Sequence, residues 1–108
     1  CLAVSIGTVH VTYKGTPNIC LDRLKEINAV VDIPLVLHGG SGTPIEVIKE
    51  CIENGICKIN INTEMSKEAV DLIQQTIQEN EKSHFSQLSV LARDRVSDVA
   101  TKYINLFR

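Results

Sequence analysis

Three apolar segments of the chain each end at a polar residue, and each is followed by a pattern typical of a helix. The segments are residues 2–9, 35–37 and 56–61. The polar residues at their ends are His10 for the first, His38 for the second, and Asn60, Asn62 and Thr63 for the third. Short, nearly continuous apolar runs suit strands that are covered on both faces, as the strands of parallel sheets are. The repeated order of strand and helix therefore predicts an α/β fold with a parallel sheet.

The segments between these strands have helical periodicity and helix-ending signals. Leu21, Leu24, Ile27 and Val30 recur at helical spacing. Pro34 is expected to end this helix, because the residue before a proline disfavours helical geometry.

The second helix has its own start and stop signals. Thr43 is expected to be its N-cap, Pro44 its first residue and Glu46 the partner in a capping box. The pair Asn54-Gly55 is a plausible stop. Apolar spacing then predicts a helix from Met65 to Ile77, and a final helix that carries residues 88–106, with a polar connection over residues 78–83.

Helices that follow strands, with polar groups at the strand ends, are typical of the active face of a TIM (β/α)8 barrel. The sequence supplies three of the eight strands of such a barrel, so the catalyst is expected to be incomplete within these 108 residues. The first strand begins at Leu2, which predicts that the chain begins inside a fold.

Composition excludes several classes of function. A net charge of −2 offers no long-range attraction for nucleic acid or an anionic membrane. No apolar run is long enough to cross a bilayer, and no secretory signal opens the chain. The four cysteines show neither CxxC nor zinc-finger spacing, and they are expected to be buried free thiols, with disulfides as the alternative. A reduced, cytoplasmic protein is therefore predicted.

His10 and His38 are candidate metal ligands. Imidazole is the commonest neutral ligand for zinc, and a catalytic zinc site keeps one position open for substrate. Two histidines at equivalent ends of adjacent strands could share one ion. The alternative is that each is a structural hydrogen-bonding residue at a strand end.

The loop Gly39-Gly40-Ser41-Gly42 is a candidate phosphate site. Glycines allow the backbone to approach an anion closely, and the helix that follows has free N–H groups at its start. Ser41 adds a hydroxyl donor, and barrels commonly bind phosphate with the loops after their last two strands. The alternative is a tight turn into the helix.

Asn60 and Asn62 flank Ile61 and should share one face of their strand. Inward-facing amides suit substrate hydroxyls or phosphate oxygens, although both could be core amides bonded to backbone. Thr63 is a candidate N-cap that is compatible with phosphate contact. Lys14 could neutralise a phosphate or be a solvated surface residue.

Five segments together closely resemble the class II fructose-bisphosphate aldolase family, and in particular the branch that includes tagatose-bisphosphate aldolase. They are Ala3-Val-Ser-Ile-Gly-Thr-Val-His10, Tyr13-Lys-Gly15, Leu24-Lys-Glu-Ile27, Ile33-Pro-Leu-Val-Leu-His-Gly-Gly-Ser-Gly42 and Lys58-Ile-Asn-Ile-Asn-Thr-Glu64. The resemblance implies that residues 1–108 are the C-terminal portion of one barrel domain, about its last three βα units with the terminal helices.

The resemblance also implies roles for individual residues. His10 and His38 would be ligands of Zn²⁺. The glycine loop (Gly39, Gly40 and Ser41), together with Asn60 and Thr63, would bind a substrate phosphate. Lys14 would lie near that phosphate and a monovalent cation, Na⁺ or K⁺. The family usually has glycine where this chain has Val11, and valine there would crowd a backbone contact to phosphate.

The activity implied is metal-dependent cleavage of a ketose 1,6-bisphosphate, fructose or tagatose, to dihydroxyacetone phosphate and glyceraldehyde 3-phosphate. The family's third zinc histidine and catalytic aspartate precede the matched segments, so the 108 residues alone are expected to be inactive. Relatives suggest a homo-oligomer, a dimer or tetramer. The alternatives are a non-catalytic sugar-phosphate-binding or assembly module, and a phosphate-binding barrel enzyme that uses no metal.

Overall fold

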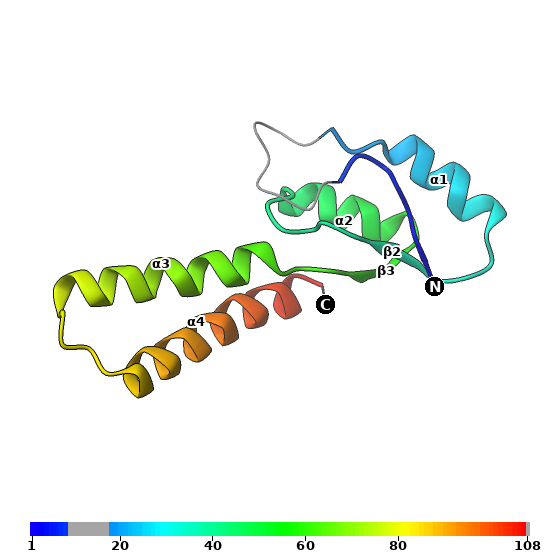
Figure 1. Cartoon of the computed structure of the whole chain (residues 1–108). Coiled ribbons are helices and arrows are strands. Elements are labelled where there is room, and N and C mark those ends of the chain that lie inside the picture. The colour runs from blue at the N-terminus through cyan, green and yellow to red at the C-terminus, as the bar shows by residue number, and fades with distance from the viewer. Residues whose placement is uncertain (9–17, 108) are drawn as a thin grey trace. The chain divides into compact units, whose positions relative to one another are not determined.

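The structure is a computed structural model that describes residues 1–8 and 18–107. The chain divides into two compact units, Cys1–Ile61 and Asn62–Arg108, and each is described by itself. Figure 1 shows the elements of both units in chain order.

The first unit is a parallel sheet with helices in its connections. Its elements are β1 (Leu2–Ala3), α1 (Leu21–Val30), β2 (Leu35–Leu37), α2 (Ile45–Glu53) and β3 (Ile56–Ile59). The strands pair in the order β1-β2-β3, and both pairs are parallel. The predicted α/β fold with a parallel sheet is therefore confirmed.

The core of this unit lies between the helices and one face of the sheet. Leu35 and Leu37 of β2 pack in one buried cluster with Leu24 of α1 and Cys51 of α2. Because side chains alternate along a strand, Val36 points to the opposite face. Its register partners there are Ala3 and Lys58, both exposed. The helices thus pack against the face of the sheet that carries Leu35 and Leu37.

Two strands are shorter than predicted. Residues 2–9 were expected as a strand, but within the described residues 2–8 the strand covers Leu2–Ala3, and Val9 lies outside the described residues. The N–H of Val4 still donates to the carbonyl of Val36 at 3.2 Å, and both Val4 and Ile6 are buried, so the apolar run continues as packed core past the end of β1. Beyond the strand, the carbonyl of Ile6 accepts a hydrogen bond from the N–H of Cys20 at 2.8 Å. Similarly, β3 ends at Ile59 rather than at residue 61.

The start of α2 differs from the prediction, whereas its end agrees. Pro44 occupies the N-cap position and α2 begins at Ile45, so the predicted capping box at Thr43 is wrong. Thr43 is instead buried, at 5% exposure, and its hydroxyl has no hydrogen-bond partner among the described residues. At the other end, the N–H of Asn54 donates to the carbonyl oxygens of Glu50 and Cys51, which closes the helix where predicted.

The second unit is a pair of helices, α3 (Thr63–Glu79) and α4 (Phe85–Leu106), that pack along each other. Figure 1 shows them side by side, joined by a short connection. Asn62, not Thr63, holds the N-cap position of α3. His84, for which the sequence suggested no role, is the N-cap of α4, and its ring nitrogen accepts a hydrogen bond from the N–H of Ser86 at 3.4 Å.

The predicted burial of the cysteines is correct only for Cys51. All four thiols are free, but Cys1, Cys20 and Cys57 are exposed. Cys57 is exposed next to the buried Ile56, at the point where the register between β2 and β3 shifts from Ile56 to Lys58. Among residues 1–8 and 18–107, no helix has the length and apolar character that crossing a membrane requires.

Candidate functional site

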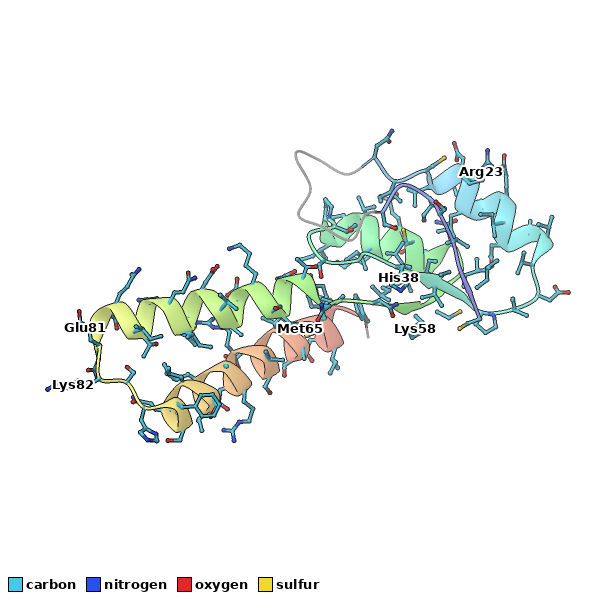
Figure 2. The ribbon with its side chains drawn as sticks, in the orientation of Figure 1. Arg23, His38, Lys58, Met65, Glu81 and Lys82 are labelled. Carbon is cyan, nitrogen blue, oxygen red and sulfur yellow. The ribbon has the colours of Figure 1, made fainter. Side chains whose placement is uncertain are left out.

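The candidate site lies where β2 and β3 end. His38 directly follows β2, and Asn60 directly follows β3. Because parallel strands point the same way, their carboxyl ends meet at one edge of the sheet. Figure 2 labels His38 at the end of β2 and Lys58 on the neighbouring strand. The sequence prediction that polar groups gather at this edge rests on this topology.

The loop after β2 is fastened to the end of β3 by backbone hydrogen bonds. The N–H of Asn60 donates to the carbonyl of Leu37 at 3.0 Å, and the N–H of Gly40 donates to the carbonyl of Asn60 at 3.1 Å. Within the loop, the N–H of Thr43 donates to the carbonyl of Gly40 at 3.2 Å. The glycine loop and Asn60 therefore form one connected structure.

Gly40 is the point of closest approach between the loop and β3. A Cβ atom at this position would lie 2.7 Å from Cγ2 of Ile59 and 3.2 Å from the carbonyl oxygen of Asn60. Gly39 and Gly42 have φ angles of 73° and 76°, which L side chains rarely adopt. The sequence therefore folds into this loop because glycine occupies all three positions.

The side chain of Asn60 is held by Lys58, two residues earlier in the chain. The ammonium group of Lys58 donates a hydrogen bond to Oδ1 of Asn60. This contact orients the amide, because Oδ1 faces the lysine. Lys58 was missed by the sequence reasoning, although period-2 alternation along a strand was a signal that could have found it.

Thr43 provides a second unpredicted feature at the base of the loop. A buried hydroxyl without a partner costs about 1–3 kcal/mol relative to a satisfied one. Among the described residues, the hydroxyl of Thr43 is in this state. A polar ligand or a water molecule in the loop would satisfy it, so this atom fits a loop that binds a polar group.

The predicted site residues are only partly brought together. His38 is exposed, Gly39 and Ser41 are half-buried, and Gly40 is buried within the first unit. Asn60 is half-buried beside them, whereas Asn62 and Thr63 belong to the second unit. Because β3 ends at Ile59, the strand alternation that predicted a shared face for Asn60 and Asn62 does not extend to them. His10, Val11 and Lys14 lie outside the described residues.

Of the two predicted zinc ligands, His38 alone lies among the described residues. Among residues 1–8 and 18–107, no three His, Cys, Asp or Glu side chains are grouped to hold a metal ion. The donor chemistry of His38 suits zinc, since its imidazole is exposed at the end of a strand.

Comparisons with known proteins find similarity over all or nearly all of the chain. A family model described as "Fructose-bisphosphate aldolase class-II" matches residues 1–108. The YdjI aldolase of Escherichia coli K12 is 35% identical, with a TM-score of 0.78 over 97% of this chain. A putative fructose-1,6-biphosphate aldolase of Coccidioides immitis is 25% identical, with a TM-score of 0.87 over 97% of this chain.

A third structure supports the fold alone. The fructose-bisphosphate aldolase of Campylobacter jejuni is 20% identical, with a TM-score of 0.69 over 96% of this chain. The matched region is 37% of the first two structures and 39% of the third. This chain therefore spans well under half the length of the proteins it resembles.

Proposed function

Because the chain belongs to the class II fructose-bisphosphate aldolase family, we propose that it forms part of a carbon–carbon lyase. The substrate is a ketose 1,6-bisphosphate of the fructose or tagatose type. The products are dihydroxyacetone phosphate and glyceraldehyde 3-phosphate. In this proposal residues 1–108 are the C-terminal βα units and terminal helices of one TIM barrel.

The observation that carries the proposal is the connection between the histidine loop and Asn60. The backbone bonds from Gly40 to Asn60 and from Asn60 to Leu37 hold a potential metal ligand, a glycine loop and an amide at one sheet edge. Aldol cleavage needs an electrophile near the ketose carbonyl and an anchor for the phosphate. Such fixed placement of reacting groups supplies much of the rate enhancement in enzymes.

His38 and His10 are the proposed ligands of Zn²⁺. When bound, zinc supplies a Lewis acid for the ketose carbonyl and for the negative charge that develops after carbon–carbon cleavage. The remaining ligand and the catalytic aspartate are expected in a part of the protein outside these residues. For that reason we expect residues 1–108 alone to be inactive.

The chain's own residues bind and orient the substrate. In the proposal, the loop of Gly39, Gly40 and Ser41 binds one phosphate, with the hydroxyl of Ser41 as a donor. The N–H of Gly40 is engaged by the carbonyl of Asn60, so Gly40 contributes through the shape of the loop. The family resemblance also assigns a phosphate contact to Thr63 at the start of α3. The anchoring of Oδ1 by Lys58 leaves Nδ2 of Asn60 as the donor toward the reacting end of the ketose.

The remaining sequence predictions stay proposals. Lys14 would add positive charge near the phosphate, with a Na⁺ or K⁺ ion close by, and Val11 would crowd one backbone contact. The assembly would be a homo-oligomer, a dimer or tetramer, in the cytoplasm.

The test is His38→Ala in the intact protein, with zinc content and cleavage of both ketose bisphosphates as readouts. Loss of one imidazole ligand should lower bound zinc and reduce kcat/KM by at least about a thousandfold, since metal activation contributes several kcal/mol to catalysis. His84→Ala is the matched control, because its imidazole only caps α4. It should keep zinc and activity.

Retention of most activity in His38→Ala would remove this residue from the metal site. Phosphate binding without any cleavage by the wild-type protein would instead favour the non-catalytic sugar-phosphate-binding module.

A further inference from the structure

Glu64 occupies a place where a carboxylate would interfere with the proposed phosphate site. It is the second residue of α3 and directly follows Thr63. The start of a helix attracts anions through its free N–H groups and its dipole. A carboxylate in the first turn can occupy the same groups and also repels a phosphate dianion. Some other part of the chain must therefore engage Glu64 if Thr63 is to bind phosphate.

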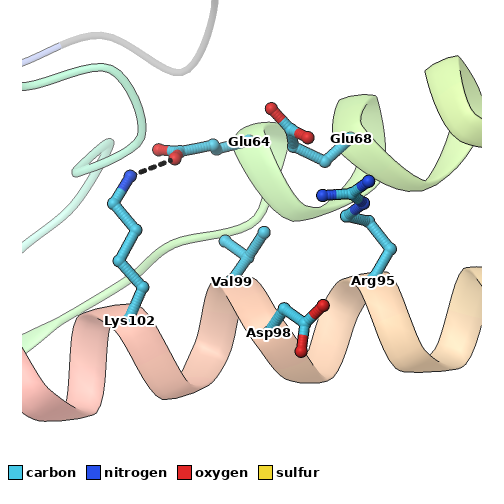
Figure 3. Close-up of a pocket in the computed structure, with 6 residues that line it drawn as sticks. All are labelled: Glu64, Glu68, Arg95, Asp98, Val99 and Lys102. Atoms are coloured by element: carbon cyan, nitrogen blue, oxygen red, sulfur yellow. Dashed lines mark hydrogen bonds and ion pairs between the residues drawn. The ribbon is translucent and has the colours of Figure 1, made fainter.

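Two neighbouring residues near the end of α4 engage the Glu64 carboxylate. The hydroxyl of Tyr103 donates a hydrogen bond to Oε2, and the ammonium group of Lys102 donates to Oε1 at 3.0 Å. The Glu64 side chain is only 25% exposed, and Tyr103 is 5% exposed. Figure 3 shows the carboxylate directed toward Lys102. Both oxygens therefore have a partner on α4.

The surroundings of this contact make Lys102 important for charge balance. A pocket of about 220 Å³ is lined by Glu64, Glu68, Arg95, Asp98, Val99 and Lys102. Its lining carries three carboxylates and two cations, so it has a formal net charge of −1. Removing Lys102 would leave three carboxylates facing one cation. In Figure 3, Arg95 lies on the side of Glu68, one turn away from Glu64.

The environment of Tyr103 supports a persistent contact. Burial, and then the hydrogen bond to Glu64, raise the pKa of the Tyr103 phenol above its ordinary value. The phenol therefore remains a donor to the carboxylate throughout the neutral range.

We propose that Lys102 and Tyr103 are positioning residues that hold the Glu64 carboxylate against α4, so that it neither occupies nor repels the phosphate bound at the start of α3. The inference rests on the proposed role of Thr63. It assigns a function to the last helix, which keeps the phosphate site clear of a competing internal anion.

The experiment measures the dissociation constant of inorganic phosphate for the intact protein by isothermal titration calorimetry at low ionic strength. Lys102→Met should weaken phosphate binding about three- to tenfold, as expected for a newly uncompensated charge several ångströms from a dianion. Tyr103→Phe should act in the same direction with a smaller effect. Adding Glu64→Gln to Lys102→Met should restore the affinity to within about twofold of wild type, because the interfering charge is then gone.

Two matched controls separate this local effect from net charge. Lys67→Met removes a positive charge from the exposed surface of α3, where Lys67 pairs with Asp71, and should leave phosphate affinity unchanged. Glu68→Gln removes a carboxylate one turn further along α3 in the same pocket. It should restore affinity to Lys102→Met less than Glu64→Gln does.

The outcomes distinguish this inference from the proposed function. If the wild-type protein binds no phosphate, or Thr63→Val binds it as well as wild type, the role of Thr63 is wrong and the inference falls with it. If wild type binds phosphate and Thr63→Val does not, but Lys102→Met binds normally, the inference alone is wrong. The inference is also wrong if Glu64→Gln fails to rescue Lys102→Met. Weakening by Lys102→Met with rescue by Glu64→Gln supports it.

Discussion

Gly40 permits the close contact between the loop after β2 and the end of β3. Its N–H donates to the carbonyl of Asn60, and a side chain at this position would collide with its neighbours. The two neighbouring atoms are a branched methyl group of Ile59 and a backbone oxygen. Neither can move far without disturbing β3. The position therefore couples the conformation of the loop to the position of Asn60.

Gly40→Ala is expected to destabilise the protein by about 1–3 kcal/mol, since added atoms in a packed region force neighbours to shift. Because the loop would be displaced from Asn60, KM for the ketose bisphosphate should also rise. Urea unfolding and steady-state kinetics measure the two effects. Gly42→Asn is the control, because Asn tolerates the positive φ of this position. An unchanged stability in Gly40→Ala would contradict the close approach.

Tyr103 gives the protein a distinct dependence of stability on alkaline pH. Its pKa in the folded protein is raised above the ordinary value of 10.0, first by burial and then by the hydrogen bond to Glu64. Below that ordinary value the phenol is protonated in both the folded and unfolded states. Above it, the unfolded chain releases a proton that the folded chain retains. The free energy of unfolding should therefore fall as pH rises.

The fall can reach about 1.4 kcal/mol per pH unit for one group. Urea unfolding between about pH 9.5 and 11.5 would measure it, and Tyr103→Phe should have a shallower slope. At neutral pH this variant should lose about 1 kcal/mol, the net value of a typical hydrogen bond. Equal alkaline slopes for the two proteins would show that Tyr103 does not retain its proton on folding.

At the residue scale, sequence reasoning could reach contacts that follow from local periodicity but not contacts between distant segments. In the predicted strand over residues 56–61, Lys58 and Asn60 are two positions apart, so alternation places both on one face, and their side chains are hydrogen-bonded in the structure. The pair Glu64 and Tyr103 is separated by 39 positions and depends on the packing of α3 against α4. No local pattern specifies that packing.

At the scale of elements, the apolar residues along α1 differ widely in burial. Leu24 is completely buried in the core of the first unit, whereas Val30 at the end of the same helix is 81% exposed. Both residues belong to the helical spacing that predicted α1. Periodicity identifies the helix, but the last turn extends past the sheet that its apolar face covers.

Leu24→Ala should therefore destabilise the protein by about 2–5 kcal/mol, through lost burial and the cavity left behind. Val30→Ala should change stability by less than about 0.5 kcal/mol, because its side chain is already in water. Chemical unfolding monitored by circular dichroism compares the two variants. A large loss for Val30→Ala would indicate that another part of the assembly covers this end of α1.

Element boundaries were harder to predict than element identity. The apolar run at residues 2–9 was interpreted as one long strand, but β1 ends at Ala3, and Ile6 is buried beyond it. A continuous apolar run records burial, which a strand and a packed irregular segment share. The prediction of Thr43 as the N-cap of α2 was also wrong by one residue. Pro44 holds the N-cap position, and the hydroxyl of Thr43 is buried in the loop without a partner among the described residues.

At the scale of the whole molecule, the two units contribute different parts of the proposed catalyst. The first contains His38, the glycine loop and Asn60, and the second contains Thr63 and the residues that engage Glu64. The family relationship could be reached from sequence, because the motifs keep their order and spacing. The proposed barrel rests on the family relationship alone, because the described residues form a sheet of three strands.

The proposed metal dependence is tested on the intact protein. Dialysis against a strong chelator should abolish cleavage, and Zn²⁺ at one equivalent per active site should restore it, because the open position on the metal serves the substrate. The assay follows both ketose bisphosphates, with a buffer-dialysed sample as control. Activity that is insensitive to the chelator would favour the barrel enzyme that uses no metal.

The cysteines give the protein a built-in reporter of its own fluctuations. Cys1, Cys20 and Cys57 are exposed to a thiol reagent, whereas Cys51 is fully enclosed and burial raises its pKa, which suppresses the reactive thiolate. Modification of Cys51 thus requires the core of the first unit to open. The slow phase of labelling would time that opening, and slowing of this phase by a bound sugar phosphate would reveal how tightly the ligand couples loop and core.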